Sequence, residues 1–375
     1  MKNVVIISNT FFSVYNFRYD LILQILKKNN VHVISRTLAS EDEKFYAKKL
    51  KSIGCKIHQV KFAQSFSLFD TLTLLGFYRK LINIKADYLL LYTIKPVIYG
   101  SIVAFILKIK QTYSTMTGLG FVYTSNGHLS GLLRFFVNLL YKFSLKSNQK
   151  VFFQNKDDLN VFVRNNLINK EKTRIIKGSG VNLKKFKTSI EKKATKKTDV
   201  ITFLMVSRIS RDKGVLEFLN SANYISKKYP NTKFLLIGKI DSNPSTLRLS
   251  DIDYLLTDSV RHLDFHHNIF DIIESSDVFV LPSYREGTPR SCLEAMALAK
   301  PIITTDVPGC REVVVDGYNG FLVQSRNEKK LSDAIEEIIL KPEIIDFFGK
   351  NSLKYVQAFD VEKVNKFFLR EIGLK

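Results

Sequence analysis

The chain has 375 residues, of which 45% are hydrophobic and 25% are charged. This length and composition indicate a globular protein of about two domains and exclude a disordered chain. The three cysteines, Cys55, Cys292 and Cys310, have no paired spacing, which argues against disulfides or a zinc site and favours a reducing, cytoplasmic setting. The longest internal apolar stretch, Val97–Leu107, falls short of the roughly 20 residues that a membrane-spanning helix needs, so we expect none.

The net charge of +22 is concentrated in the first half of the chain. Residues 1–195 contain 32 Lys and Arg against 10 Asp and Glu, whereas residues 196–375 contain 25 of each sign. No acidic residue lies between Asp87 and Asp157. A basic half beside a neutral half indicates an anionic partner for one domain only.

Apolar strands alternate with segments of helical length along the whole chain. The opening residues MKNVVIISNTFF predict a buried strand rather than a signal peptide, and a helix is expected from Asn16. In the first half, strands are predicted at Asn3–Ser8, Val31–Ser35, Lys56–Val60, Tyr88–Thr93, Gln111–Thr115 and Lys150–Gln154. In the second half, strands are predicted at Val200–Val206, Lys233–Gly238, near Val260, at Asp277–Leu281 and at Pro301–Thr305, with helices from Lys213 and Pro289.

This alternation predicts an α/β protein with two doubly wound, Rossmann-like domains, because parallel sheets are covered by helices on both faces. The polar, lysine-rich stretch Lys184–Asp199 is the natural boundary. We therefore expect domains at residues 1–190 and 191–355, and a C-terminal helix within 356–375 that packs back toward the first domain. Such sheets bind ligands outside the carboxyl ends of their strands, so we expect the active site in the cleft between the domains.

The stretch SYREGTPRSCLEAMALAKPIITTDVPGCREVV follows a predicted buried strand directly. Thr288 suits an N-cap and Pro289 the first helical position, so the preceding turn would offer free N–H groups to an anion. Glu286 lies in that turn and Glu294 about one turn into the helix, where carboxylates suit the vicinal hydroxyls of a ribose or a sugar. Spacing alone favours the alternative that both are ordinary solvated residues at a helix start.

A second loop, SRISRDKG at Ser207–Gly214, follows the first predicted strand of the second half. Arg208 and Lys213 could clamp a diphosphate, since fixed cations stabilise the charge of a leaving group without a metal. Taken alone, a solvated basic loop is the better interpretation. The two loops occur in order, each at the carboxyl end of a strand, and this combination favours a functional site.

These stretches resemble the donor-site motifs of the retaining glycosyltransferases of family 4, which have the GT-B fold. The first resembles that family's E-x7-E motif, the second its G-R-L-x-x-x-K-G loop, and GSGVNLKKF its G-x-D-x-x-x-F turn, with Asn182 in place of Asp. The resemblance implies that Glu286 lies near the donor sugar, that Glu294 binds the ribose, and that no metal or cofactor is required. It implies further donor contacts at Arg208, Lys213, Gly287, Thr288 and Pro289, and base contacts within Leu263–His266.

The first half resembles a branch of that family that adds amino sugars to lipid-diphosphate-linked sugars. It lacks a G-G-x-x-R loop and carries instead an N-F-R element and the stretch TMTGLGFVY. This resemblance places five residues on the acceptor or sugar side: Asn16, Arg18, Lys95, Gly118 and Gly120. For Arg18, a phosphate contact and a structural salt bridge are equally good interpretations, and a plain turn explains the glycines as well. Many members have a histidine where this chain has Ile94 and Lys95, so the group that assists proton transfer stays open.

The segment Gly131–Lys150 has a broad apolar stripe, and its only charges are Arg134, Lys142, Lys146 and Lys150. This composition is typical of a helix that lies in an anionic membrane interface. A buried core helix with basic ends is the alternative.

The leading hypothesis is a metal-independent retaining transferase. It would move an N-acetylhexosamine such as GalNAc or GlcNAc from UDP to a polyprenyl-diphosphate-linked saccharide, in bacterial surface polysaccharide synthesis at the cytoplasmic face of the inner membrane. Alternatives are a soluble or other lipid acceptor, a UDP-sugar hydrolase or epimerase, and a basic nucleic-acid-binding protein. The last is disfavoured because the chain has no helix-turn-helix, RRM or zinc signature, and a dinucleotide oxidoreductase because G-x-G-x-x-G is missing.

Overall fold

The computed structural model describes residues 1–37, 40–62, 70–120, 123, 128–186, 199–240, 245–264 and 269–374. The chain divides into two units. The N-terminal unit consists of Met1–Val122, Asn126–Ser179 and Glu362–Lys375, and the C-terminal unit of Gly180–Val361 with Tyr123–Ser125. The sequence placed the corresponding boundaries at residues 190 and 355. Most of the predicted linker, residues 187–198, lies outside the described residues.

Seven parallel strands form the sheet of the N-terminal unit, in the order β3-β2-β1-β4-β5-β6-β7. This is the order of a doubly wound sheet. The strands are β1 (Asn3–Ile7), β2 (Asn30–Arg36), β3 (Lys56–Val60), β4 (Tyr88–Tyr92), β5 (Gln111–Met116), β6 (Lys150–Phe153) and β7 (Thr173–Ile175). The short edge strand β7 was not predicted.

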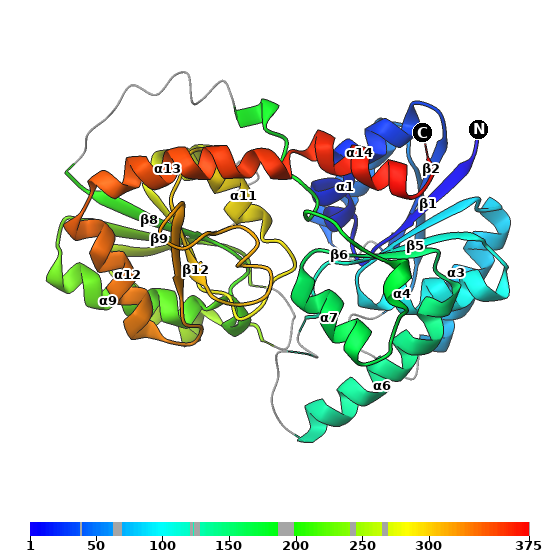
Figure 1. The fold of residues 1–375 in the computed structure, drawn as a ribbon, viewed down its shortest axis with the longest axis horizontal. Helices are drawn as coiled ribbons and strands as arrows, with labels where there is room; N and C mark the ends of the chain where they lie inside the picture. The colour runs from blue at the N-terminus through cyan, green and yellow to red at the C-terminus, as the bar shows by residue number, and fades with distance from the viewer. Residues whose placement is uncertain are drawn as a thin grey trace. The chain divides into compact units, whose positions relative to one another are not determined.

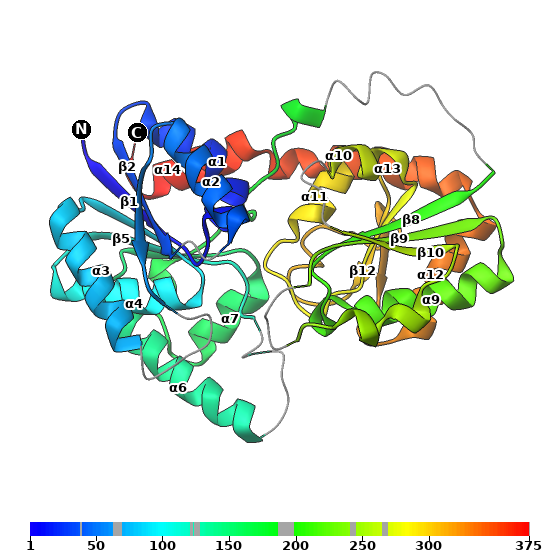
Figure 2. The same ribbon diagram turned by 180° about the vertical axis from the view of Figure 1, so that it is seen from behind.

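Helices cover both faces of this sheet (Figures 1 and 2). One face is packed by α1 (Phe11–Leu26), α2 (Glu41–Ser52) and α14 (Val361–Glu371), and the other by α3 (Asp70–Ile84), α4 (Ile94–Ile106), α6 (His128–Ser144) and α7 (Lys156–Arg164). Among the described residues, no helix combines the length and apolar content needed to span a bilayer.

Helix α1 begins five residues before its predicted start at Asn16. The hydroxyl of Thr10 accepts a hydrogen bond from the N–H of Ser13 at 3.0 Å, which caps the first turn. The buried carboxylate of Glu43, on α2, accepts a further bond from the N–H of Phe11 at 2.7 Å. Because these groups satisfy backbone donors that a helix leaves free, the helix extends to Phe11.

The C-terminal unit repeats the design with six parallel strands in the order β10-β9-β8-β11-β12-β13. The strands are β8 (Ile201–Val206), β9 (Thr232–Ile237), β10 (Val260–Leu263), β11 (Val278–Leu281), β12 (Ile302–Thr305) and β13 (Gly320–Val323). Helices α9 (Val215–Lys228) and α12 (Glu328–Leu340) cover one face, and α10 (Phe270–Ser275), α11 (Arg290–Ala297) and α13 (Glu343–Tyr355) the other (Figures 1 and 2). Both sheets therefore confirm the predicted fold class.

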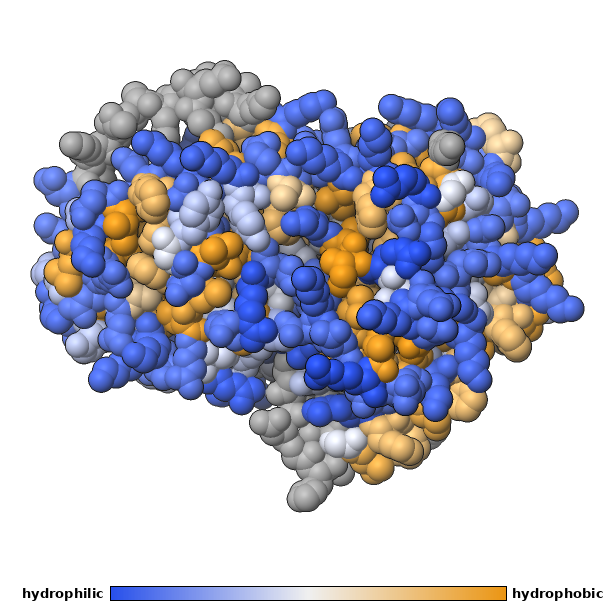
Figure 3. Space-filling view, in the orientation of Figure 1, coloured by the Kyte–Doolittle hydropathy of each residue, from blue (hydrophilic) through white to orange (hydrophobic). Residues whose placement is uncertain are grey.

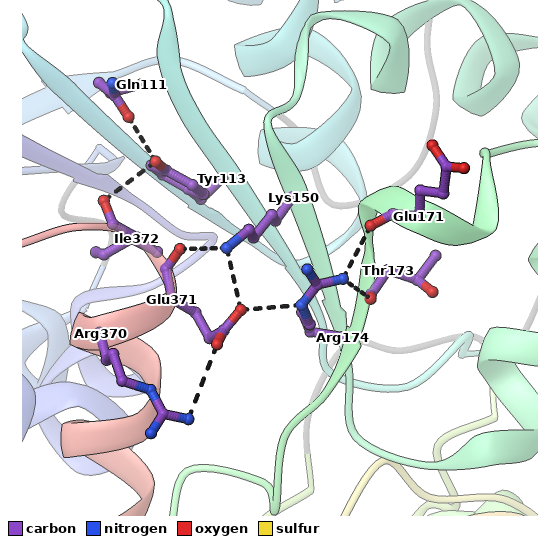
Figure 4. A network of polar contacts seen from close by, with 9 residues as sticks. All are labelled: Gln111, Tyr113, Lys150, Glu171, Thr173, Arg174, Arg370, Glu371 and Ile372. Atoms are coloured by element: carbon purple, nitrogen blue, oxygen red, sulfur yellow. Dashed lines mark hydrogen bonds and ion pairs between the residues drawn. The ribbon is translucent and has the colours of Figure 1, made fainter.

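The C-terminal helix α14 is anchored to the sheet of the N-terminal unit through Glu371 (Figure 4). Its carboxylate accepts hydrogen bonds from Lys150 Nζ at 3.0 Å and Arg174 Nε at 2.9 Å. The hydroxyl of Tyr113 donates to the carbonyl oxygen of Ile372 at 3.1 Å. The hydrogen bond from Lys150, helped by the one from Arg174, lowers the pKa of Glu371 below its usual range. Lys150, which the sequence assigned to the membrane helix, thus lies in β6, and α6 already ends at Ser144.

Replacing Glu371 should loosen this anchor. We expect Glu371→Gln to lower the free energy of unfolding of the N-terminal unit by about 2 kcal/mol, because two charge-assisted hydrogen bonds are weakened. Since the pKa of Glu371 is lowered in the folded protein, its stabilising effect is present above pH about 4.5 and is lost as the pH falls. The difference between the native protein and the variant should therefore shrink in acid.

Denaturant unfolding and hydrogen exchange of the α14 amides measure the effect. Arg370→Gln is the control, because the exposed Arg370 lies 3.9 Å from the same carboxylate. Equal losses from both substitutions would show that Lys150 and Arg174 do not anchor the helix.

Candidate functional site

The loop Ser207–Gly214 leaves the carboxyl end of β8 and leads into α9. Gly214 has a φ of 73°, in the left-handed region that favours glycine. A Cβ there would lie 2.2 Å from the carbonyl oxygen of Pro282, so only glycine lets the two backbones approach. Pro282 directly follows β11, the neighbour of β8 in the sheet. The reversal of strand order at this point brings the two predicted loops together.

The second loop, Ser283–Pro289, is held by its backbone on two sides. The N–H of Tyr284 donates to the carbonyl of Asp212 at 2.9 Å, and the N–H of Glu286 to that of Pro308 at 3.0 Å. Gly309, with a φ of 85°, packs so closely that a Cβ would lie 2.3 Å from the carbonyl oxygen of Glu286. This fixes the direction in which Glu286 leaves the loop.

The start of α11 differs by one residue from the prediction. Pro289, with a φ of −70°, is the N-cap residue, and Arg290 is the first helical residue. The sequence placed the N-cap at Thr288 and the first helical position at Pro289. A helix leaves the N–H groups of its first residues without partners, so the missing N–H of proline costs nothing there, and its φ suits the start of a helix. Pro289 is therefore accommodated at the N-cap, one position before the first helical residue.

The side chains of Lys213 and Glu286, one from each loop, form an ion pair. Both side chains are largely buried, with 17% and 13% of their surfaces exposed. The hydroxyl of Ser283 donates to the same carboxylate oxygen, Oε1 of Glu286, at 2.8 Å. The structure therefore brings together the two residues that the motifs singled out separately, and it adds Ser283, which the sequence analysis did not assign to the site.

Arg208 lies beside Asp212 on the first loop, with Nη2 3.6 Å from Oδ2. The hydroxyl of Ser245 donates to Oδ1 of Asp212 at 2.5 Å. Burial raises the pKa of Asp212, but the hydrogen bond from Ser245, the nearby hydroxyl of Ser210 and the charges of Lys213 and Arg208 outweigh it and lower the pKa. Asp212 is therefore an anion beside Arg208, whose side chain is 42% exposed.

Glu294 lies on α11, where Arg290 Nε donates to its Oε1 at 3.0 Å, one helical turn away. Leu263 ends β10 at the same edge of the sheet, half-buried. His262 beside it contacts the carbonyl of Gly238 at 3.1 Å. His266 and His267 lie outside the described residues. In the part of the chain that is described, no group of three His, Cys, Asp and Glu side chains could hold a metal ion.

Two cysteines lie buried behind the Ser283–Pro289 loop. Burial, together with the charge of Glu286, raises the pKa of Cys310 to about 12, and burial raises that of Cys292 well above its usual value. Both thiols are therefore protonated and unsuited to act as nucleophiles.

The five residues assigned to the acceptor side lie in the N-terminal unit. The buried guanidinium of Arg18 lies 4.1 Å from the ring centre of Tyr92 and donates to the carbonyl of Phe17 at 3.2 Å. Asn16 donates to the carbonyl of Phe12 at 3.0 Å. Gly118 and Gly120, with φ of 113° and 62°, follow β5. The neighbouring Phe121 and Val122 of that stretch lie outside the described residues.

Lys95 is buried, with its ammonium group 2.5 Å from Oδ1 of Asp70. The hydroxyl of Tyr99 donates to the other oxygen of Asp70 at 2.7 Å. The structure therefore places Lys95 inside the unit, where it ties α4 to the start of α3, rather than on a surface open to an acceptor. The sequence analysis also missed Glu43 at the start of α1, because the contact joins residues 32 positions apart.

Comparisons with known proteins agree with this architecture. Residues 186–355 match the family model described as glycosyl transferases group 1, and residues 4–155 match glycosyl transferase 4-like. A solved structure, Anabaena HepE in complex with UDP and glucose, is similar over 100% of this chain and 99% of its own, with a TM-score of 0.76 and 17% identity. Sucrose-phosphate synthase from Thermosynechococcus elongatus gives the same TM-score at 19% identity over the full length of both chains. These structures establish the fold.

Curated relatives extend over most of the chain. The N,N'-diacetylbacillosaminyl-diphospho-undecaprenol alpha-1,3-N-acetylgalactosaminyltransferase of Campylobacter jejuni is 31% identical over 372 residues, which cover 96% of this chain and 95% of the relative. The UDP-Gal:alpha-D-GlcNAc-diphosphoundecaprenol alpha-1,3-galactosyltransferase of Escherichia coli is 26% identical over 78% of this chain and 77% of its own. The chain, with its two Rossmann-like units, therefore belongs to the group 1, family 4-like glycosyltransferases.

Proposed function

We propose that the enzyme transfers an N-acetylhexosamine from UDP to a polyprenyl-diphosphate-linked saccharide, with retention of configuration at the sugar. The observation that carries the donor half is the meeting of Lys213 and Glu286 where the loops after β8 and β11 come together. A cation and a carboxylate at one point match the two parts of a nucleotide sugar, its diphosphate and its hydroxyls.

The ion pair also suggests how the donor enters. A bound diphosphate would compete with Glu286 for the ammonium group of Lys213, and Arg208, whose side chain is partly exposed, would add a second cation. Release from Lys213 would leave the Glu286 carboxylate to accept hydrogen bonds from sugar hydroxyls. Glu294 would in the same way accept from the ribose. Because the two cations supply the charge that the departing diphosphate requires, we include no metal in the proposal.

In a single displacement, retention requires that the acceptor attack from the side on which the diphosphate leaves. In this proposal a departing phosphate oxygen takes the proton of the acceptor hydroxyl, and Glu286 positions the sugar rather than attacking it. The names of two relatives support the stereochemistry and the acceptor, since both specify alpha linkages and an undecaprenol diphosphate sugar. The second of these names also supports a UDP donor.

A lipid-linked acceptor requires contact with a membrane, and α6 has a suitable surface. Its Val137 and Tyr141 are buried against the unit, whereas six apolar side chains on other sides are exposed: Leu132, Leu133, Phe135, Phe136, Leu139 and Phe143. Hydrophobic residues gather over α6 at the lower edge of the face in Figure 3. The exposed Lys142 lies on α6, and the exposed Lys146 lies in the 3-10 turn Leu145–Ser147 that follows it. We propose that this surface docks on an anionic membrane face.

The donor site is tested by substitutions in the ion pair. Glu286→Gln and Lys213→Met should each lower the rate of UDP release in the presence of acceptor by about 100-fold, because a preorganised charge is lost. The matched control is an exposed ion pair, in which Nζ of Lys228 on α9 lies 2.5 Å from Oε1 of Glu336 on α12. Lys228→Met and Glu336→Gln should leave the rate within about twofold. An unchanged rate for Glu286→Gln would refute its role.

The acceptor class is tested with UDP-GalNAc and UDP-GlcNAc against a short-chain polyprenyl-diphosphate saccharide and the same saccharide without lipid. We expect product, identified by mass, with the lipid diphosphate only. Transfer to the free saccharide at an equal rate would favour a soluble acceptor. Full release of free sugar without any acceptor would favour a hydrolase.

The membrane surface is tested by flotation with vesicles. The double variant Phe135→Ser, Phe136→Ser should bind anionic vesicles at least about tenfold more weakly than the native enzyme, because it loses aromatic surface that would be buried in the membrane. Phe347→Ser is the control, since Phe347 on α13 is 55% exposed and Phe136 is 54% exposed. Binding of the native enzyme should be weaker to neutral vesicles and at high salt. Negligible binding to both kinds of vesicle would contradict the proposal.

A further inference from the structure

A hydrogen bond joins α9 to the loop that carries Glu286. The hydroxyl of Tyr284 donates to Oε1 of Glu217 at 2.5 Å. Glu217 lies in the first turn of α9, three residues after Gly214, and is only 8% exposed. Tyr284 lies two residues before Glu286. The bond therefore connects the segment that follows Lys213 with the segment that precedes Glu286.

The surroundings of Tyr284 determine which partner holds the proton. Burial, the hydrogen bond to Glu217 and the charge of that carboxylate raise the pKa of Tyr284 well above its ordinary value, although Arg326 and Arg211 oppose the shift. The guanidinium of Arg326 lies over the ring, 4.5 Å from its centre. The phenol is thus a donor, with Arg326 over its ring and its hydroxyl bound to Glu217 on α9.

This bond adds a side-chain constraint to a loop already held by its backbone. The N–H of Tyr284 is bound to Asp212, and the hydroxyl of Ser283 to Glu286 at 2.8 Å. Without the hydroxyl of Tyr284, the start of the loop would lose its tie to α9, and Glu286, two residues later, could shift within the limits that its backbone bond to Pro308 allows. A displacement of about 1 Å at a reacting centre can cost a factor of about 100 in rate.

A purely stabilising role explains the pair poorly. Oε2 of Glu217 is buried and has no hydrogen-bond partner within the described part of the chain. A buried carboxylate with an oxygen that accepts no hydrogen bond lowers the stability of the folded protein. Proteins in which such a buried polar pair is replaced by apolar side chains of similar size are commonly as stable or more stable. A costly polar contact at this place is better explained by the geometry that it imposes on the neighbouring loop.

We propose that Glu217 and Tyr284 are positioning residues, which hold Glu286 at the correct place relative to Lys213 during sugar transfer. Neither residue needs to touch the donor, since both act through the Ser283–Pro289 loop. The inference rests on the proposed donor site. It predicts an effect on turnover that is larger than the effect on nucleotide binding.

The test compares Tyr284→Phe, Glu217→Ala and Glu217→Gln with UDP-GalNAc and a short-chain polyprenyl-diphosphate saccharide. Tyr284→Phe and Glu217→Ala should lower kcat by about 10- to 100-fold, while the Kd of UDP stays within about threefold. Glu217→Gln should recover most of kcat, because an amide oxygen still accepts from the tyrosine. Tyr284→Phe retains the ring but leaves the buried Glu217 without this hydrogen bond, so the unfolding temperature should fall. We therefore compare kcat of all variants at a temperature at which each is fully folded, which separates positioning from misfolding.

The chain offers a matched control on the same helix. The hydroxyl of Tyr229, directly after α9, donates to Glu336 Oε1 at 2.5 Å, the same distance as in the proposed pair. Tyr229→Phe removes a hydrogen bond of equal length between a tyrosine and a glutamate, and it should leave kcat within about twofold of the native value.

Three results would overturn the positioning role. If Glu286→Gln abolishes transfer but Tyr284→Phe and Glu217→Ala retain kcat within about twofold, the positioning role is wrong and the donor site stands. The positioning role is also wrong if kcat and UDP binding fall together with the unfolding temperature. If Glu286→Gln itself leaves transfer unchanged, the donor site fails and the positioning role fails with it.

Discussion

The ion pair between Lys213 and Glu286 depends on the order of strands in the C-terminal sheet. Strands β8 and β11 are neighbours although two strands and two helices separate them in sequence. The chain turns to one face after β8 and to the other after β11, so the two loops diverge from a common point at the carboxyl edge. Gly214 and Gly309 then allow backbone contacts that a Cβ would prevent. The strand order brings the two loops together, and the two glycines let their backbones come into contact. The proposed donor site depends on both.

The N-terminal unit shows why charge in a sequence is an incomplete guide to partners. Lys95 is buried against Asp70, and Lys150 and Arg174 are bound to Glu371. These cations serve the packing of α3, α4 and α14 within the unit. In the proposed membrane surface, the exposed basic residues are instead Lys142 on α6 and Lys146 directly after it, on the segment that carries the exposed apolar side chains. Net charge indicates an anionic partner, but only burial shows which charges can meet it.

Much of the fold could be predicted from patterns in the chain. Strand β3 was predicted with its exact bounds, and most other predicted strands differ by one or two residues, because buried parallel strands are runs of apolar residues. The edge strands β7 and β13 were missed, since β7 has only three residues with a charged one at its centre, and β13 begins at Gly320, a residue that is disfavoured in strands. The start of α1 was misplaced although its N-cap, Thr10, is local, and the carboxylate of Glu43, which also accepts from the first helical N–H, belongs to another helix.

The amino-acid sequence by itself determined the fold class, the two-unit plan, the family and the motifs that carry Lys213 and Glu286. These are local properties, readable from apolar runs, turn residues and short motifs. Only the tertiary structure decided that Lys213 and Glu286 meet, and that Ser283 binds Glu286 and Tyr284 binds Glu217. It also decided that Lys95 is buried against Asp70. Such contacts join residues far apart in the chain, because the doubly wound order places loops from different strands at one edge of a sheet.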